Sequence, residues 1–217
     1  MTNSNPERRW YQFSMRTMLL VMLVFCVWIG IRVNWARNNR ERVAAVVTAV
    51  TEIEKLGGEV TSAYQNLRPQ TWLETLLDDP GSRDDPVSVL EVTSVSFEVT
   101  DQTDAGLEYL KDLPELEFLG LSYTRVTDAG LEHLKDLPKL RVLWISHTQV
   151  TDAGLEHLKN LTEIENLDLS FTQVTDAGLE HLKDLPKLTV LWLIGTQVTD
   201  EGVKKLQQAL PNCKITR

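Results

Sequence analysis

The decapeptide VTDAGLEHLK occurs three times in the chain without change, at residues 126–135, 150–159 and 174–183. It contains an aspartate, a glutamate and a histidine, the residue types that bind metal ions and transfer protons. A residue that is needed equally in every copy of a repeat is usually structural. The decapeptide therefore either carries chemistry itself or positions other residues that do.

The histidines of the three copies form a row at 24-residue spacing: His133, His157 and His181. Helices packed side by side lie about 8 to 10 Å apart, whereas zinc needs nitrogen ligands at about 2 Å. We therefore expect a solvated or helix-packing row of histidines and no metal site. The two cysteines, Cys26 and Cys213, have no metal-ligand spacing and form no disulfide framework. The chain also lacks a nucleophile elbow, a phosphate-binding loop and a zinc signature, so we predict no enzyme and no cofactor.

The elements that hold this row repeat every 24 residues from Val92 onward. One unit, residues 140–150, reads LRVLWISHTQV, and the alternation of its apolar residues predicts a short strand. A helix is predicted after each strand. In the preceding unit Thr127 or Asp128 would cap this helix, its leucines fall on one face, and Pro138 ends it. Neither element can bury its apolar face alone, so the units should stack.

The repeated L-x-x-L-x-I-x-x-T-x-V pattern followed by VTDAGL resembles the leucine-rich-repeat family, in its short ribonuclease-inhibitor-like and F-box-associated form. The resemblance implies an α/β solenoid with a parallel sheet on the concave side and helices on the convex side. Together with its apolar N-terminal segment, the chain is similar to single-span bacterial proteins that carry a few such repeats. One departure is a threonine where the family often has asparagine, at Thr124, Thr148, Thr172 and Thr196.

Charge is unevenly distributed along the chain. Residues 1–50 hold seven arginines against Glu7 and Glu41, a net charge of +5, so the remainder must carry −14 to reach the total of −9. A body this acidic should repel nucleic acid. The short basic end next to an apolar segment indicates a membrane instead.

The apolar segment predicts a transmembrane signal anchor over residues 13–35, preceded by a basic tail at residues 1–12. Its uncharged core is only the 15 residues 17–31, but Arg16 and Arg32 have long stems that can reach the headgroups. A cleaved signal peptide is the alternative, although no small-x-small cleavage site follows. The flanking arginines do not distinguish the two orientations, and we take the extracytoplasmic side as the working location of the repeats.

Residues 36–91 are predicted to form a helix-and-strand region that caps the solenoid, and residues 92–217 to form about five repeats. In the capping region, valines and Ile53 make one apolar helical stripe, which Gly57 and Gly58 end.

The repeats differ mainly at strand positions that should face away from the core. Trp144 and Trp192 would lie roughly 10 Å apart on the concave surface, with Asp168 between them. We identify as candidate partner-binding residues Phe118, Trp144, Asp168, Trp192, Val142, Val190, His147 and Phe171. The alternative is that these side chains only cover one another across the strands.

We therefore predict a non-enzymatic, membrane-anchored leucine-rich-repeat protein that binds a protein or peptide on its concave face. Asp168 and the indoles favour a ligand with a cationic group, while a sugar stacked on tryptophan is a further option. The alternative function is a structural envelope or spacer protein without a dedicated ligand.

Overall fold

The computed structural model describes residues 41–62, 92–97 and 104–217. The chain divides into two compact units, residues 1–42 and 43–217. The predicted tail and the predicted anchor at residues 13–35 lie outside the described residues. Among the residues that are described, no helix is both long enough and apolar enough to cross a bilayer.

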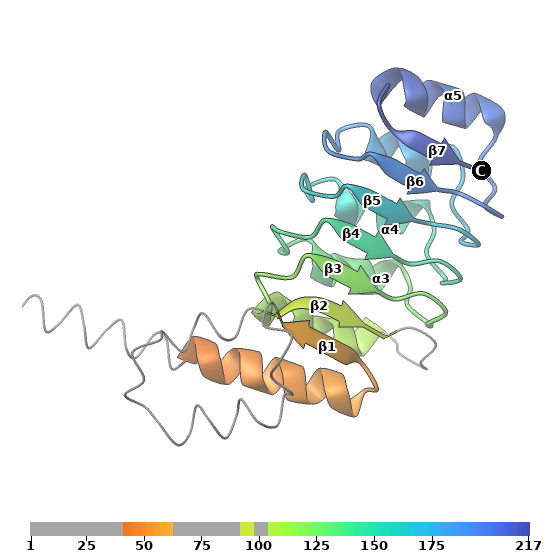
Figure 1. The fold of residues 1–217 in the computed structure, drawn as a ribbon. Coiled ribbons are helices and arrows are strands. Elements are labelled where there is room, and N and C mark those ends of the chain that lie inside the picture. Colours follow the sequence, from red (N-terminus) through yellow and green to blue (C-terminus); the bar gives the residue numbers. More distant parts are fainter. Residues whose placement is uncertain (1–40, 63–91, 98–103) are drawn as a thin grey trace, which may run out of the picture. The chain divides into compact units, whose positions relative to one another are not determined.

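The described residues form a seven-stranded sheet whose strands follow one another in chain order (Figure 1). The strands are β1 Glu59–Ser62, β2 Val92–Ser96, β3 Phe118–Gly120, β4 Val142–Trp144, β5 Asn166–Asp168, β6 Val190–Trp192 and β7 Lys214–Thr216. From β2 to β7 every pair is parallel, and each residue of β3 to β7 lies beside the residue 24 positions earlier. The predicted α/β solenoid with a parallel sheet is therefore confirmed.

The helical segments all return the chain along one face of the sheet (Figure 1). Their bounds are η2 Asp104–Asp112, α3 Asp128–Leu131, η3 Glu132–Leu134, α4 Asp152–Leu155, η4 Glu156–Leu158, η5 Gly178–Leu182 and α5 Asp200–Ala209. The prediction of one regular helix per repeat was thus too simple, since most repeats have a short α-turn, a 3-10 turn or both. A three-residue strand spans only about 10 Å, and two short turns are enough to cover that length.

The core lies between the sheet and these segments. Inward leucines of the strands, such as Leu119 and Leu143, are fully buried, as are Leu131 and Leu134 of the helical face. Each such side chain contributes roughly 1.5 to 3 kcal/mol by leaving water. The apolar stripes of strand and helix therefore stabilise the stack only together.

Residues 43–55 are helical and bury Val50 and Ile53 in the same core. Gly57, at φ 81°, ends this helix in the left-handed conformation that glycine adopts readily. The chain then enters β1, which pairs antiparallel with β2. The strand of the predicted capping region is therefore β1, which pairs with the edge of β2.

The aspartate of each decapeptide joins two repeats. The amide of Thr151 donates to Oδ1 of Asp128 at 2.7 Å, and its hydroxyl donates to Oδ2 at 2.6 Å. The same hydroxyl accepts from the amide of Ala153 and so caps the next helical turn. The arrangement recurs in four successive pairs: Asp104–Thr127, Asp128–Thr151, Asp152–Thr175 and Asp176–Thr199.

The repeated glycine leaves space for this carboxylate. A Cβ on Gly154 would meet Oδ1 of Asp128 too closely to be accommodated without a shift. The group that approaches closely is the carboxylate of the preceding repeat.

We predict that Gly154→Ala lowers the free energy of unfolding by about 1 to 3 kcal/mol, because the new methyl group displaces the Asp128 carboxylate from Thr151. Urea unfolding followed by far-UV circular dichroism measures the loss. The control is Asp128→Ala, in which the carboxylate is already absent. In the Asp128→Ala background, Gly154→Ala should lower the free energy of unfolding by less than it does in the native chain. An equal loss in both backgrounds would contradict the proposed contact.

Candidate functional site

The open face is defined as the face of the sheet opposite the described helical segments (Figure 1). The strand register places two columns of side chains on it. The first column is Phe118, Val142, Asn166 and Val190, and the second is Gly120, Trp144, Asp168 and Trp192. The six candidate residues that lie on strands are thus brought onto one surface.

Part of this surface is covered by its own neighbours. The rings of Phe118 and Trp144 meet edge to face, with centroids 4.9 Å apart and an interplanar angle of 84°. Val142, Val190 and Trp192 are half-buried, while Trp144 keeps 37% of its surface exposed. Cross-strand packing therefore accounts for Phe118 but leaves much of Trp144 available to a partner.

Asp168 lies between the two tryptophans in the register. Its Oδ1 accepts a hydrogen bond from the amide of Ser170 at 2.9 Å, which holds the half-buried carboxylate beside its own strand. Within the described residues Asp168 forms no ion pair. The open face thus carries one carboxylate whose charge is not paired there.

The turns that follow β3, β4 and β5 each carry one aromatic ring, and the three rings form a stack. Tyr123, His147 and Phe171 all have left-handed backbone conformations, with φ of 61°, 55° and 57°. The His147 ring lies between the other two, with both centroid distances 4.2 Å and interplanar angles of 13° and 17°. This aromatic stack borders the open face, and both of its end members are more than half exposed.

Tyr123 was not among the candidate residues, although it stands 24 positions before His147 and could have been found by that spacing. In the repeat after Phe171 the same position is occupied by Gly195, at φ 71°. A Cβ there would lie 2.6 Å from the Phe171 ring, so the end of the aromatic stack lies over this glycine.

Buried threonines fix the turns that carry the stack. The hydroxyl of Thr148 donates to the carbonyl of Ile145 at 2.7 Å, and Thr124, Thr172 and Thr196 make the same bond in their repeats. Ser146 also donates to Ser122 at 3.0 Å. A hydroxyl therefore satisfies the turn carbonyl at the position where the family often has asparagine.

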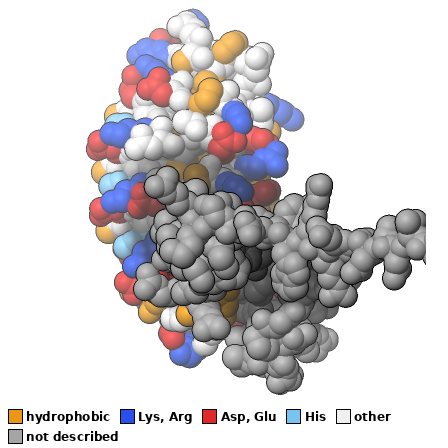
Figure 2. All heavy atoms as spheres, turned by 90° about the vertical axis from the view of Figure 1, so that its left-hand side faces the viewer, with side chains coloured by type: hydrophobic (Ala, Val, Ile, Leu, Met, Phe, Trp, Pro, Cys, Tyr) orange, Lys and Arg blue, Asp and Glu red, His pale blue; other side chains and the backbone are white. Residues whose placement is uncertain are grey.

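The histidine row lies on the helical side, away from the open face. His133, His157 and His181 are half-buried, and Figure 2 shows histidines recurring among acidic and basic side chains along one side of the molecule. A hydrogen bond from Lys135 lowers the pKa of Glu132, and the two side chains form an ion pair. No group of three potential metal ligands occurs in the described part of the chain.

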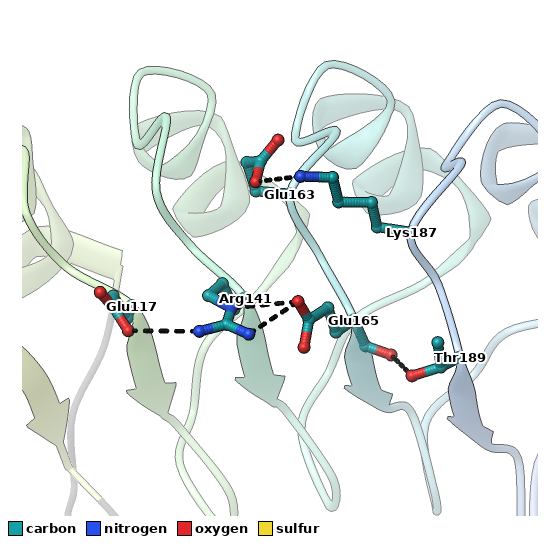
Figure 3. A network of polar contacts seen from close by, with 6 residues as sticks. All are labelled: Glu117, Arg141, Glu163, Glu165, Lys187 and Thr189. Carbon is teal, nitrogen blue, oxygen red and sulfur yellow. Dashed lines mark hydrogen bonds and ion pairs between the residues drawn. The ribbon is translucent and has the colours of Figure 1, made fainter.

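Ion pairs connect successive repeats at the edge where the strands begin (Figure 3). Arg141 binds Oε1 of Glu165 through Nε at 3.1 Å and Nη2 at 2.8 Å, and its Nη1 lies 3.8 Å from Glu117. The Glu165 carboxylate raises the pKa of the Arg141 guanidinium. Lys187 pairs with Glu163 at 2.6 Å, and Lys139 pairs with Glu115. Sequence reasoning missed these pairs, which neutralise charge along this edge.

Comparison with known proteins agrees with this geometry. The family model described as "Leucine Rich repeat" matches residues 136–159 and 160–183. These two stretches are successive 24-residue units of the stack, and the units around them have the same register. Residues 136–183 therefore carry two leucine-rich repeats. No curated protein matches it significantly.

Solved structures with a similar arrangement include internalins and another bacterial repeat protein. An internalin (inlF) of Listeria monocytogenes is 27% identical at a TM-score of 0.44, over 50% of this chain and 30% of its own. A leucine-rich-repeat protein of Leptospira interrogans is 18% identical at 0.39, over 51% and 33%. Internalin C2 of Listeria monocytogenes is 22% identical at 0.40, over 58% and 70%. The chain thus spans about a third of the length of the first two.

Cys213 lines an open pocket at the last repeat, beside Leu188 and Leu210. Burial raises the pKa of its thiol to about 11, so the thiol remains protonated at neutral pH. A protonated thiol is a poor nucleophile, and Cys213 is best explained as a small apolar residue of the core.

We predict that Cys213 reacts with iodoacetamide more slowly than a free thiol does at pH 8, because burial keeps it protonated and shielded. A Cys26→Ser variant isolates Cys213, and mass spectrometry measures the rate before and after urea unfolding. Unfolding should restore the ordinary rate. A folded-state rate equal to that of free cysteine would show that the thiol is neither buried nor suppressed.

Proposed function

We propose that this protein is a membrane-anchored, non-enzymatic leucine-rich-repeat protein that binds a protein partner through the open face and the adjoining aromatic stack. Leucine-rich-repeat proteins generally mediate protein–protein interaction.

The observation that supports it most is where large apolar side chains stay exposed. In the described residues these are Leu56, Tyr123, Trp144, Phe171 and Ile194. Four of the five lie on the open face or in the turns that border it. Exposed aromatic residues that gather on one surface are typical of binding sites rather than of a surface built for solubility.

The helical side provides the contrast. Its exposed positions are mainly charged, and within the repeats they form short pairs such as Lys135 with Glu132 and Lys159 with Glu156. Exposed pairs of this kind contribute little to stability and keep a surface hydrated. A partner that buries apolar area would therefore gain more on the open face.

Anchoring in a membrane is proposed from the sequence of residues 13–35. Because the flanking arginines do not distinguish the two orientations, the extracytoplasmic location of the repeats is a separate part of the proposal, in which the open face meets a partner outside the cell. A cleaved signal peptide would place the repeats on that side as well, without the anchor.

We predict that a photocrosslinking residue at Asn166, on the open face, gives a discrete adduct in intact native cells. The amount of adduct should fall strongly in the double variant Trp144→Ala and Trp192→Ala, because truncating a central aromatic residue of an interface commonly costs more than about 1 kcal/mol of binding free energy. Immunoblotting measures the adduct.

Two controls accompany this experiment. The crosslinker at Ala153, exposed on the helical side, should give no such adduct, and Lys135→Ala with Lys159→Ala should leave the Asn166 adduct unchanged. Circular dichroism checks that every variant is folded. Equal adducts from both positions, or an adduct that survives loss of both tryptophans, would favour a spacer without a dedicated ligand.

We also predict that the full chain stays with membranes after an alkaline carbonate wash. Leu23→Arg with Val24→Arg should release it, since a charge at the centre of a span costs about 2.5 to 3.5 kcal/mol. External protease should remove the repeats in intact cells. Protection that ends only when the cells are opened would place the repeats inside, and a mature chain lacking residues 13–35 would establish a cleaved signal peptide.

A further inference from the structure

The two tryptophans of the open face stand on either side of one carboxylate. Trp144 pairs with Asp168, and Asp168 pairs with Trp192, in three adjacent parallel strands. Neighbouring strands are about 4.8 Å apart, so the two tryptophan backbones are separated by about 10 Å. A ligand group that reaches Asp168 therefore lies next to both tryptophan positions.

Charge on this surface is arranged in favour of a cation. At the nearby edge, Arg141 is engaged by Glu117 and Glu165, and Lys187 by Glu163 (Figure 3). None of these basic groups pairs with Asp168 in the described structure. Lys214 lies beside Val190, two strands from Asp168, and forms no ion pair with it among the described residues.

The Asp168 carboxylate is also held in place. Its Oδ1 accepts from the amide of Ser170, and its Oδ2 has no hydrogen-bond donor among the described residues. Because the oxygen is already positioned, a ligand that donates to it would lose little freedom of the protein in binding.

We infer that Trp144, Asp168 and Trp192 form a subsite for a cationic side chain of the protein partner, with arginine preferred over lysine. This inference rests on the proposed function and names the chemistry that the partner must present. A guanidinium is planar, stacks on indole rings and donates to a carboxylate. It is also more weakly hydrated than an ammonium group, which suits a site bordered by Phe118, Val142 and Val190.

A neutral ligand makes a different use of the same surface. A sugar can stack on an indole but gains nothing from the negative charge of Asp168. Binding of a cationic ligand should therefore depend on Asp168, whereas binding of a neutral ligand should not.

The test uses the full chain, solubilised in a mild detergent and labelled with ¹⁵N-tryptophan. Three capped peptides are compared, Gly-Gly-Arg-Gly-Gly and its lysine and citrulline counterparts, because citrulline has the shape of arginine without its charge. Shifts of the indole N–H signals report binding, and the variants Trp144→Phe and Trp192→Phe assign two of the six tryptophans. Peptide concentrations on the order of 10 mM are needed for so small a ligand.

We expect the arginine peptide to shift both indole signals, and the citrulline peptide to bind roughly fivefold more weakly. Asp168→Asn should weaken the arginine peptide by a similar factor and leave the citrulline peptide unchanged. Asp136→Asn removes the same charge from the helical side and should change neither. Added salt should weaken the arginine peptide alone.

Equal binding of the arginine and citrulline peptides, or no effect of Asp168→Asn, would overturn the inference. So would the absence of any shift with the arginine peptide. An Asn166 adduct that still depends on the tryptophans would then show that the open face binds its partner through apolar or neutral contacts. Loss of that adduct would instead remove the proposed function itself.

Discussion

Each repeated threonine donates a pair of hydrogen bonds to the aspartate one repeat earlier, and this contact joins every helical turn to the one before it. The threonine amide and hydroxyl both point at the same carboxylate, as Thr151 does at Asp128. Because that hydroxyl also caps the next helical turn, one side chain starts the turn and sets its distance from the previous repeat. On the sheet side, backbone amides at and beyond the strand ends donate to carbonyls of the next repeat, as Leu121 does to Trp144, and these bonds set the spacing of the sheet. The two sets of bonds together fix the angle between repeats.

The residues that repeat and the residues that vary therefore have different tasks. The aspartate of the decapeptide is engaged in holding two repeats together, and the hydrogen bonds from Thr199 lower the pKa of Asp176, which keeps that carboxylate ionised and acceptor-only. Its glycine has no side chain because the carboxylate of the preceding repeat's aspartate occupies the space that a Cβ would need. This uniform frame brings positions 24 residues apart to the same height on neighbouring strands. A residue on the open face that differs between repeats is thus positioned by the repeated frame around it.

Sequence reasoning identified the period, the strands and the inward leucines, because alternation and 24-residue spacing are local patterns. It also placed Trp144, Asp168 and Trp192 side by side, since register in a solenoid follows from the period alone. It did not identify the partner of the repeated glycine, because nothing local shows that Asp128 reaches Thr151. It also did not predict that Tyr123 stacks on His147, because the sequence shows their 24-residue spacing but not the left-handed backbone that brings the rings together. The ion pairs of Arg141 were missed for the same reason, since they join residues of different repeats.

The contrast between the two surfaces is the strongest physical argument about what the open face is for. On the helical side, acidic groups such as Glu132 and Glu156 are paired with lysines and hydrated, as solubility requires. On the open face, Asp168 stands between two indoles, and no basic group of the described residues is paired with it. Removing such a carboxylate from water is costly unless a positive charge compensates it. A partner that covers the tryptophans must therefore either bring a cation to Asp168 or bear the cost of burying its charge.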